Sequence, residues 1–414
     1  MLDVTQAKLE IFKQQPRAEA VTVTLSEANG LTLAEDILSP TALPVFDNSA
    51  MDGFALCGDD VAHATTTEPV RLQIIGDIWA GKVTDLQLTP GTCVRIMTGA
   101  KTPAGASAVV MQENVATQDA ILLVSAPLKN FENMRRRGEE IPAGAMLMRA
   151  GQKITPSGIG LLASVGVSQL RVFPQPRVVI IPTGSELVAP GTVLQGSQIY
   201  ESNSFALRAA LADMGITPTV MPIVADDKAA LFKTLQTALQ TATHVILCGG
   251  VSVGDHDHSK SILADCGVRE VFWGVKQKPG KPFYFGLRGA TAVFGLPGNP
   301  ASSLVCFYEY VRAALLQYRH ALGAHELKKY AAVLSGALSK KNDFTHFIRA
   351  RAFFENHGGK QVLKVRPLVR QGSHMMTSFA EANCLPEFAK DTQALSDGDL
   401  VDIQFLPQEE LHDS

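Results

Sequence analysis

The chain has 414 residues, of which 46% are hydrophobic and 19% are charged. This composition excludes a disordered, collagen-like or low-complexity protein, and the length exceeds what one hydrophobic core usually serves, so we expect several domains. The 37 basic and 40 acidic residues leave a formal net charge of -3, which excludes a global field that attracts nucleic acid or an acidic membrane. Any anion that binds here must be held by local groups.

The sequence carries no pattern of membrane insertion or export. No apolar run approaches the roughly 18 residues that span a bilayer. The first residues lack the basic segment followed by an apolar one that is typical of a secretory signal. The six cysteines include no CxxC pair, which is typical of free thiols in a reducing compartment. We therefore expect a cytoplasmic protein without a membrane or nucleic-acid partner.

The first part of the chain predicts a domain that is interrupted by another. Apolar residues recur at a helical period from Asp3 to Gln15. Thr155-Pro156 predicts the start of a second helix, which ends at Gly166. We expect these two helices to pack together in a discontinuous helix and strand linker domain, residues 1–46 and 139–173. The short strands between them predict an inserted β-rich domain, residues 47–138.

The later part of the chain predicts two further domains. The run RVVIIPTG is β-branched and typical of a strand that is buried on both faces of a parallel sheet. Helices and strands then alternate, which predicts a doubly wound α/β domain over residues 174–325. Short strands return over residues 326–414 and predict a small β-barrel or sandwich. The expected fold class is α/β plus all-β in a multidomain chain.

Acidic residues follow three strands that we expect in the α/β domain. Glu186 follows the first, Asp226 follows the second, and a glycine-rich segment that ends in Asp257 follows the third. Ligands of open α/β sheets bind beyond the carboxyl ends of the strands. Glycines let backbone N–H groups approach an anion, Ser252 adds a hydroxyl donor, and carboxylates suit Mg²⁺. One such segment alone is typical of a turn with a capping aspartate, whereas three in one domain favour a binding site.

Lys276, Lys278 and Lys281 cluster in the segment GVKQKPGKPF. The Pro-Gly turn between the last two would bring two cations into a small volume, which suits phosphate or another oxyanion. A solvated loop is the alternative, and the glycine-rich segment favours binding. The segment GLPGNP predicts a rigid turn that feeds a helix, and its prolines can form a pocket wall.

Two polar segments lie outside the α/β domain. Residues 47–53 read DNSAMDG and bring two carboxylates into one loop, and residues 134–140 read MRRRGEE. Arginine matches tetrahedral oxyanions, but a run of charge is equally typical of a solvated face or an interface. Both interpretations of the arginine segment stay open.

The motifs DNSAMDGFA, IMTGA, RRRGEE, PTGSEL, CGGVSVGDHD, KPGKPF, GLPGNP and QGSH occur in this order between residues 47 and 374. Together they resemble the molybdopterin molybdenumtransferase family of the bacterial MoeA type, which is similar to the E domain of gephyrin. The ordered set is specific and covers nearly the whole chain. The chain departs from the family pattern at Gly274, where some relatives carry Lys, and at Glu140, where Asp is usual.

The resemblance implies four domains per protomer and an elongated homodimer with the active cleft between the subunits. It implies that molybdate and adenylylated molybdopterin bind in the α/β domain, and that the enzyme uses Mg²⁺, releases AMP and forms the molybdenum cofactor. The resemblance also implies that the C-terminal domain is a β-barrel. Its further implied partners are the molybdopterin adenylyltransferase and the acceptor molybdoenzymes.

The resemblance also implies the site residues. Glu186, Asp226 and Asp257 become the metal and substrate carboxylates. Asp52 and Thr98 of the partner subunit would reach the cleft. The implied catalytic residues are Asp257, Lys278, Lys281, Asp52 and Thr98. The pyrophosphate of the substrate would contact Gly249, Gly250, Ser252 and Gly254. The oxyanion pocket would be formed by Pro282, Arg349 and Ser373, with Pro297 and Pro300 in its wall.

Two other functions stay open. The α/β domain could adenylylate molybdopterin, because that partner enzyme has a similar domain, although an adenylyltransferase would not need the β-rich and C-terminal domains. A non-catalytic scaffold of the gephyrin kind is the second alternative, and no long linker or proline-rich interaction segment favours it.

Overall fold

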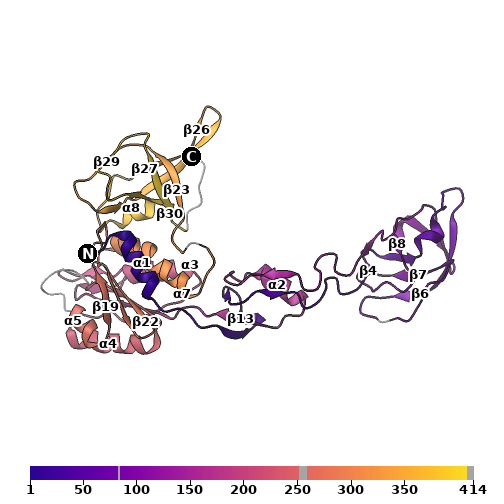
Figure 1. Cartoon of the computed structure of the whole chain (residues 1–414), viewed down its shortest axis with the longest axis horizontal. Helices are drawn as coiled ribbons and strands as arrows, with labels where there is room; N and C mark the ends of the chain where they lie inside the picture. The colour runs from indigo at the N-terminus through magenta and orange to yellow at the C-terminus, as the bar shows by residue number, and fades with distance from the viewer. Residues whose placement is uncertain (83, 251–258, 324, 408–414) are drawn as a thin grey trace.

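The computed structural model describes residues 1–82, 84–250, 259–323 and 325–407. The molecule is elongated: a β-rich unit lies at one end, and a body made of the α/β sheet and the C-terminal strands lies at the other (Figure 1). A narrow middle segment with α2 and β13 joins the two ends. The residue limits of the four domains stay predictions.

The chain passes through the middle segment twice, since β1 and β2 of the outward path pair with β13 of the return path. Thr155 begins the helix of this segment, because its hydroxyl accepts a hydrogen bond from the backbone nitrogen of Gly158 at 3.2 Å. Leu33, Leu162 and Val172 form its small core. The elements are β1 (Val21–Thr24), β2 (Thr32–Leu33), β3 (Ile37–Leu38), β12 (Met146–Met148), α2 (Pro156–Ser164) and β13 (Gln169–Phe173).

The β-rich unit is a sheet in the order β8-β5-β7-β6-β10-β9. Neighbouring residues of one strand point to opposite faces, so Phe54 packs in one core and Ala55 in another. Both faces of this sheet are therefore covered. The elements are β4 (Asn48–Ser49), β5 (Gly53–Leu56), β6 (Val70–Ile78), β7 (Thr92–Ile96), β8 (Ala108–Met111), β9 (Val115–Gln118), β10 (Ile121–Val124) and β11 (Met134–Arg135).

The N-terminal helix α1 (Val4–Gln14) packs on the α/β body and not on α2. Its apolar face, with Val4, Ala7 and Ile11, joins the core that α7 (Arg312–Tyr318) lines. The expectation that the two N-terminal helices pack together is therefore wrong. The Lys8 ammonium lies 2.8 Å from the buried Glu309 carboxylate, and this ion pair holds the helix to the body.

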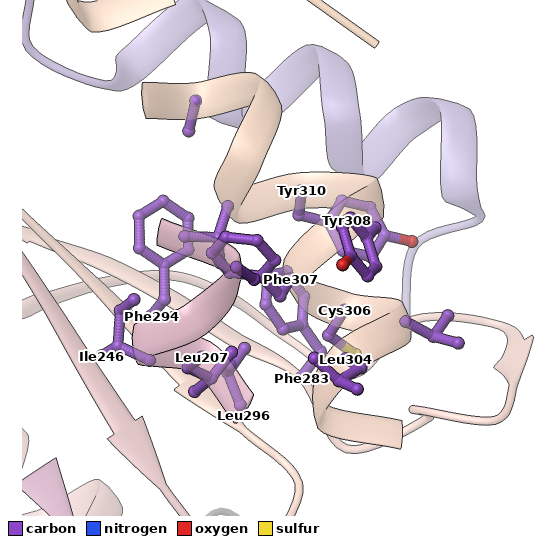
Figure 2. Close-up of a cluster of buried hydrophobic side chains, with 14 of the residues drawn as sticks. Leu207, Ile246, Phe283, Phe294, Leu296, Leu304, Cys306, Phe307, Tyr308 and Tyr310 are labelled. Carbon is purple, nitrogen blue, oxygen red and sulfur yellow. The ribbon is translucent and has the colours of Figure 1, made fainter. Parts of the chain in front are cut away.

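The α/β sheet has the order β17-β14-β18-β22-β21-β19, with the first four strands parallel. Residues of β14 alternate between two cores, one lined by α3, α6 and α7 and shown in Figure 2, the other lined by α4 and α5. RVVIIPTG thus forms a strand buried on both faces, and the doubly wound α/β fold is confirmed. The elements are β14 (Val178–Pro182), β15 (Leu187–Val188), β16 (Ile199–Tyr200), α3 (Asn203–Asp213), β17 (Thr219–Val220), α4 (Lys228–Thr241), β18 (His244–Cys248), α5 (Ser259–Asp265), β19 (Arg269–Trp273), β21 (Tyr284–Arg288), β22 (Thr291–Leu296), α6 (Pro300–Cys306) and a π-helical turn (Phe307–Val311) that leads into α7.

The C-terminal strands form a barrel. β28, β26, β27, β23 and β30 pair in this order, and β30 pairs back with β28, which closes the ring. β20 leaves the α/β unit and pairs with β25, so the lysine turn lies where the two units meet. The elements are β20 (Gln277–Lys278), β23 (Lys329–Leu334), β24 (Leu338–Ser339), β25 (Thr345–Phe347), β26 (Ala350–His357), β27 (Lys360–Pro367), α8 (Met376–Glu381), β28 (Cys384–Phe388), β29 (Ala394–Leu395) and β30 (Leu400–Phe405). None of the helices in the described ranges is long and apolar enough to cross a membrane.

Candidate functional site

A cleft of about 630 Å³ opens where β14, β18 and β22 end. The carboxyl ends of parallel strands are the edge at which an open α/β sheet binds its ligands. Residues singled out in the sequence line much of this cleft: Glu186, Asp226, Gly249, Gly250, Pro282, Pro297 and Pro300.

One wall of the cleft is acidic. The loops after β14 and before α4 are tied by two hydrogen bonds, from the Ser185 nitrogen to Asp226 Oδ2 at 3.1 Å and from the Asp226 nitrogen to Ser185 Oγ at 2.8 Å. Asp227 instead caps α4, accepting a bond from the Ala230 nitrogen at 2.7 Å. Neither Glu186 nor Asp226 forms an ion pair within the described residues. No basic side chain in the described part of the chain therefore competes with a bound cation for these two carboxylates.

The turn after β18 requires glycine for packing. Gly249 and Gly250 have φ of +97° and +63°. A Cβ on Gly249 would lie 2.6 Å from the carbonyl oxygen of Thr183, and one on Gly250 would lie 2.7 Å from Ser259 Oγ. These glycines therefore let the ends of β14 and β18 meet at the cleft. Ser252, Gly254 and Asp257 lie outside the described residues.

The opposite wall joins the α/β unit to the barrel. Asn299, which precedes α6, donates from Nδ2 to Ser373 Oγ at 3.1 Å, and the carbonyl of Ser373 accepts from the Ala301 nitrogen at 3.1 Å. Ser373 is not among the residues that line the cleft, but His374 beside it is. The QGSH loop thus lies against the GLPGNP turn.

Arg349 is a buried cation without an acidic partner in the described part of the chain. Its side chain is 1% exposed, and its Nη2 donates to the carbonyl of Gly372 at 3.1 Å, next to Ser373. Burial lowers the pKa of its guanidinium to about 10, so the group keeps its charge at neutral pH. A buried charge without a counter-ion suits a site that receives an anion.

The lysine turn adjoins the same wall. Lys278 and Lys281 are exposed, and neither forms an ion pair with a residue that the structure describes. Neither lines the cleft directly, although Pro282, next to Lys281, does. Lys276 differs from both, because its ammonium binds Asp343 of the barrel unit at 2.7 Å. Of the three lysines in this segment, only Lys278 and Lys281 are therefore without an ion pair to a described residue.

Asp52 and Thr98 lie away from this cleft, in the β-rich unit at the other end of the molecule (Figure 1). The Thr98 nitrogen and hydroxyl both donate to Asp52 Oδ1. In the same unit Arg136 lies over the Phe131 ring, and Arg137 lines a separate hollow of about 970 Å³. The structure does not bring these residues to the cleft of their own chain.

Three regions of known protein families match almost the whole length of the chain. Residues 2–166 match the MoeA N-terminal region (domain I and II), residues 179–317 a probable molybdopterin binding domain, and residues 331–406 the MoeA C-terminal region (domain IV). A molybdopterin molybdenumtransferase of Haemophilus influenzae is 34% identical over 409 residues, 98% of each chain. This chain belongs to the molybdopterin molybdenumtransferase family.

Other members of the family agree. Molybdopterin molybdenumtransferase 2 of Mycobacterium tuberculosis is 35% identical over 412 residues, 97% of this chain and 99% of that one. A crystal structure of a molybdopterin biosynthesis MoeA protein from Pyrococcus horikoshii is 28% identical, with a TM-score of 0.81 over 98% of this chain and 99% of that chain. The resemblance drawn from the motifs is thus confirmed.

Several residues that line the cleft of this molybdenumtransferase family member were not predicted from the sequence. Asn203 and His374 both line the cleft, and Asn203 Nδ2 donates to the carbonyl of Gly298 at 2.8 Å. Glu201 is buried at the same cleft and binds the nitrogen of Ser204 at 2.8 Å. His374 belongs to the QGSH motif, which could have indicated it, whereas the segment YESN carries no comparable signal.

Proposed function

We propose that this chain inserts molybdenum from molybdate into adenylylated molybdopterin, with Mg²⁺-dependent cleavage of the adenylate and release of AMP. Family membership supports a molybdopterin molybdenumtransferase. One observation carries the rest: the strand-end cleft has unpaired carboxylates, Glu186 and Asp226, on one wall, while the loops next to the other wall carry the cations. An anhydride joined to an anionic pterin needs such charge neutralisation.

The acidic wall fits Mg²⁺. Within the described ranges no group of three or more His, Cys, Asp and Glu side chains is arranged to hold a metal ion. Mg²⁺ does not need such a cage, because it typically binds one or two carboxylates together with waters and phosphate oxygens. Glu186 and Asp226 would hold the ion, with Asp257 as the third proposed ligand. The bound ion would neutralise charge on the phosphates.

The opposite side would hold the oxyanions. Arg349 contacts the carbonyl of Gly372, which places its guanidinium beside the loop of Ser373. Lys278 and Lys281 add two cations on a neighbouring turn. We assign molybdate, a tetrahedral dianion and a substrate, to this group, and the adenylate to the turn of Gly249 and Gly250 with Pro297 and Pro300 as walls. Binding both substrates side by side would hold the metal near the dithiolene.

We also propose that the active enzyme is a homodimer. Asp52 and Thr98 can complete a cleft only in a second copy, because they adjoin β5 and β7 of the β-rich unit, which lies at the other end of the molecule from the cleft (Figure 1). Exposed apolar side chains in the lining of the cleft support this, namely Ile199 and Tyr200, which are 53% and 46% exposed. The molybdopterin adenylyltransferase would supply the substrate and acceptor molybdoenzymes would take the product. We place the enzyme in the cytoplasm, where free thiols persist.

The test is AMP formation by the purified full chain. With adenylylated molybdopterin, molybdate and Mg²⁺ present, we expect one AMP for each molybdenum bound to the pterin, and a loss of AMP when either molybdate or Mg²⁺ is left out. ATP consumption with molybdopterin alone would favour the adenylyltransferase instead. No turnover under either condition, with binding retained, would favour a scaffold.

A further inference from the structure

The turn that carries Lys278 and Lys281 is held from inside the protein by a buried amide. Gln277 is fully buried, and its Nε2 donates to the carbonyl of Pro279 at 3.0 Å. The same nitrogen lies 3.5 Å from the sulfur of Cys306, which in turn donates to the carbonyl of Gly280 at 3.7 Å. The carbonyls of Pro279 and Gly280, which lie between the two lysines, therefore each accept a hydrogen bond from a buried side chain.

Tyr310 binds this turn at both ends. Its hydroxyl donates to Gln277 Oε1 at the start of the turn. Its ring stacks on Phe283 at the end, with ring centroids 4.6 Å apart and planes 21° apart (Figure 2). Tyr310 is 1% exposed and lies in the π-helical turn Phe307–Val311. Such single π-helical turns inside an α-helix are rare and occur frequently at functional sites.

The packing leaves the turn little freedom. Gly280 has φ of +93°, and a Cβ there would lie 2.6 Å from both Cys306 Sγ and Gln277 Nε2. The direction of the hydrogen bonds is fixed, because the Pro279 carbonyl can only accept and so must face Nε2. Burial raises the pKa of the Tyr310 hydroxyl well above its ordinary value, so that group stays a donor to Oε1.

Neither Gln277 nor Tyr310 can touch a ligand, since both are buried, yet both contact the segment that presents the two exposed ammonium groups. We propose that Gln277 and Tyr310 are positioning residues that hold Lys278 and Lys281 in the arrangement that binds a tetrahedral oxyanion. The inference rests on the proposed function, in which these lysines bind molybdate. A buried polar network that is fully satisfied selects one conformation, which an apolar core would not do.

The first experiment measures molybdate binding to the full chain by calorimetry. Tyr310→Phe removes the hydroxyl and keeps the ring, and Gln277→Leu removes the amide. We expect each to raise the Kd for molybdate by about 10-fold, the effect of one lost buried hydrogen bond on the geometry of the site. Tyr308→Phe is the matched control, because Tyr308 is buried two residues away and stacks on Phe379. We expect it to bind molybdate like the unaltered chain.

The second experiment separates positioning from general destabilisation. If Tyr310 acts through the lysines, adding Tyr310→Phe to the double variant Lys278→Ala/Lys281→Ala should change the Kd no further. A Tyr310 effect that persists in the absence of both lysines would overturn the inference. Unaltered molybdate affinity in Tyr310→Phe would also overturn it, while leaving the proposed function intact.

Amide hydrogen exchange tests the turn without any ligand. We expect the peptide that spans 279–284 to exchange about 10-fold faster in Tyr310→Phe than in the unaltered chain or in Tyr308→Phe. If the unaltered chain binds no molybdate, the assignment of molybdate to this site fails, and exchange alone then decides whether Tyr310 holds the turn. Equal exchange rates would show that it does not.

Discussion

Thr98 donates two hydrogen bonds to a single oxygen of Asp52, from its backbone nitrogen and from its hydroxyl, each 2.7 Å from Oδ1. These bonds lower the pKa of the Asp52 carboxyl below its ordinary value of 3.8, because they stabilise the charged form. They also fix the direction of a side chain that the described residues of the same chain leave exposed. A fixed, charged carboxylate on a protruding unit is suited to complete a site on a second molecule.

Thr98→Ala should destabilise the protein in a pH-dependent way. The pKa of Asp52 is lowered in the folded state, so the stabilisation is present above the unfolded-state pKa and is lost as pH falls through the folded-state pKa. We expect the variant to be less stable than the unaltered chain at neutral pH and the difference to shrink in acid, measured by urea unfolding over a pH series. The control is Thr102→Ala, whose hydroxyl donates to the carbonyl of Asp47 and to no titrating group. A Thr98→Ala effect as independent of pH as that of the control would contradict this account.

Two inactive variants should restore activity to each other if the cleft is completed across a dimer. The two variants are Asp52→Ala and Asp226→Ala. Asp52 belongs to the β-rich unit and Asp226 to the α/β unit, which lie at opposite ends of the molecule (Figure 1). Co-expression at equal levels should give dimers of which half are mixed, and each mixed dimer has one site in which both residues are intact. We expect about a quarter of the unaltered AMP-forming activity from a twofold symmetric dimer. If the co-expressed protein is no more active than either variant alone, Asp52 and Asp226 do not meet in one site across a dimer.

Gly249→Ala should lose more stability than the same substitution at a glycine of positive φ whose added Cβ would meet no other atom. The added Cβ would meet the carbonyl oxygen of Thr183 at 2.6 Å, where two central strands end. The control is Gly191→Ala, which has φ of +90° and nothing within 4 Å of its Cβ. The control should cost about 1 kcal/mol from backbone strain alone, and Gly249→Ala should exceed it. Urea unfolding of both variants checks this, and equal losses would show that the strand ends adjust freely.

Arg349→Met should weaken oxyanion binding without a comparable loss of stability. The loss of stability should stay within about 2 kcal/mol, because the substitution leaves the Gly372 carbonyl without its Nη2 donor but also removes the desolvation cost of a buried charge. The molybdate concentration for half-maximal AMP formation should rise at least about 10-fold, since a charged hydrogen bond is lost. Arg366→Met, on the exposed barrel surface over Phe353, is the control. A large drop in the melting temperature with unchanged molybdate dependence would make Arg349 a structural residue.

The sequence carried enough to predict the strands and the edge where the site lies. Residues 178–181 (VVII) can be buried on both faces because they carry apolar side chains only, and the carboxyl ends of parallel strands meet at one edge. Glu186 and Asp226 were therefore predicted to share a site, and they line one cleft. The neighbouring Asp227 shows the limit, because only the hydrogen bond to Ala230 reveals it as a helix cap.

Contacts between distant elements were not predictable in the same way. The apolar face of α1 indicates that the helix is buried but not against what, and its partner is α7. Nor could spacing indicate that Lys276 pairs with Asp343, which lies 67 positions further along the chain. Asn203 is the first residue of α3, and its sequence segment carries no signal of a site, whereas His374 stands in the QGSH motif, which could have indicated it. Their place at the cleft follows only from the meeting of α3 and the barrel loop with the sheet.

The most direct test compares the two adjacent aspartates after β17. Asp226→Ala removes a carboxylate that lines the cleft, whereas Asp227→Ala removes a helix cap. We expect Asp226→Ala to lower the rate of AMP release by about 100-fold with little change in stability, and Asp227→Ala to cost about 1 kcal/mol of stability while keeping most of the rate. Equal rates of AMP release in the two variants would contradict the assignment of this cleft as the place where the adenylate is cleaved.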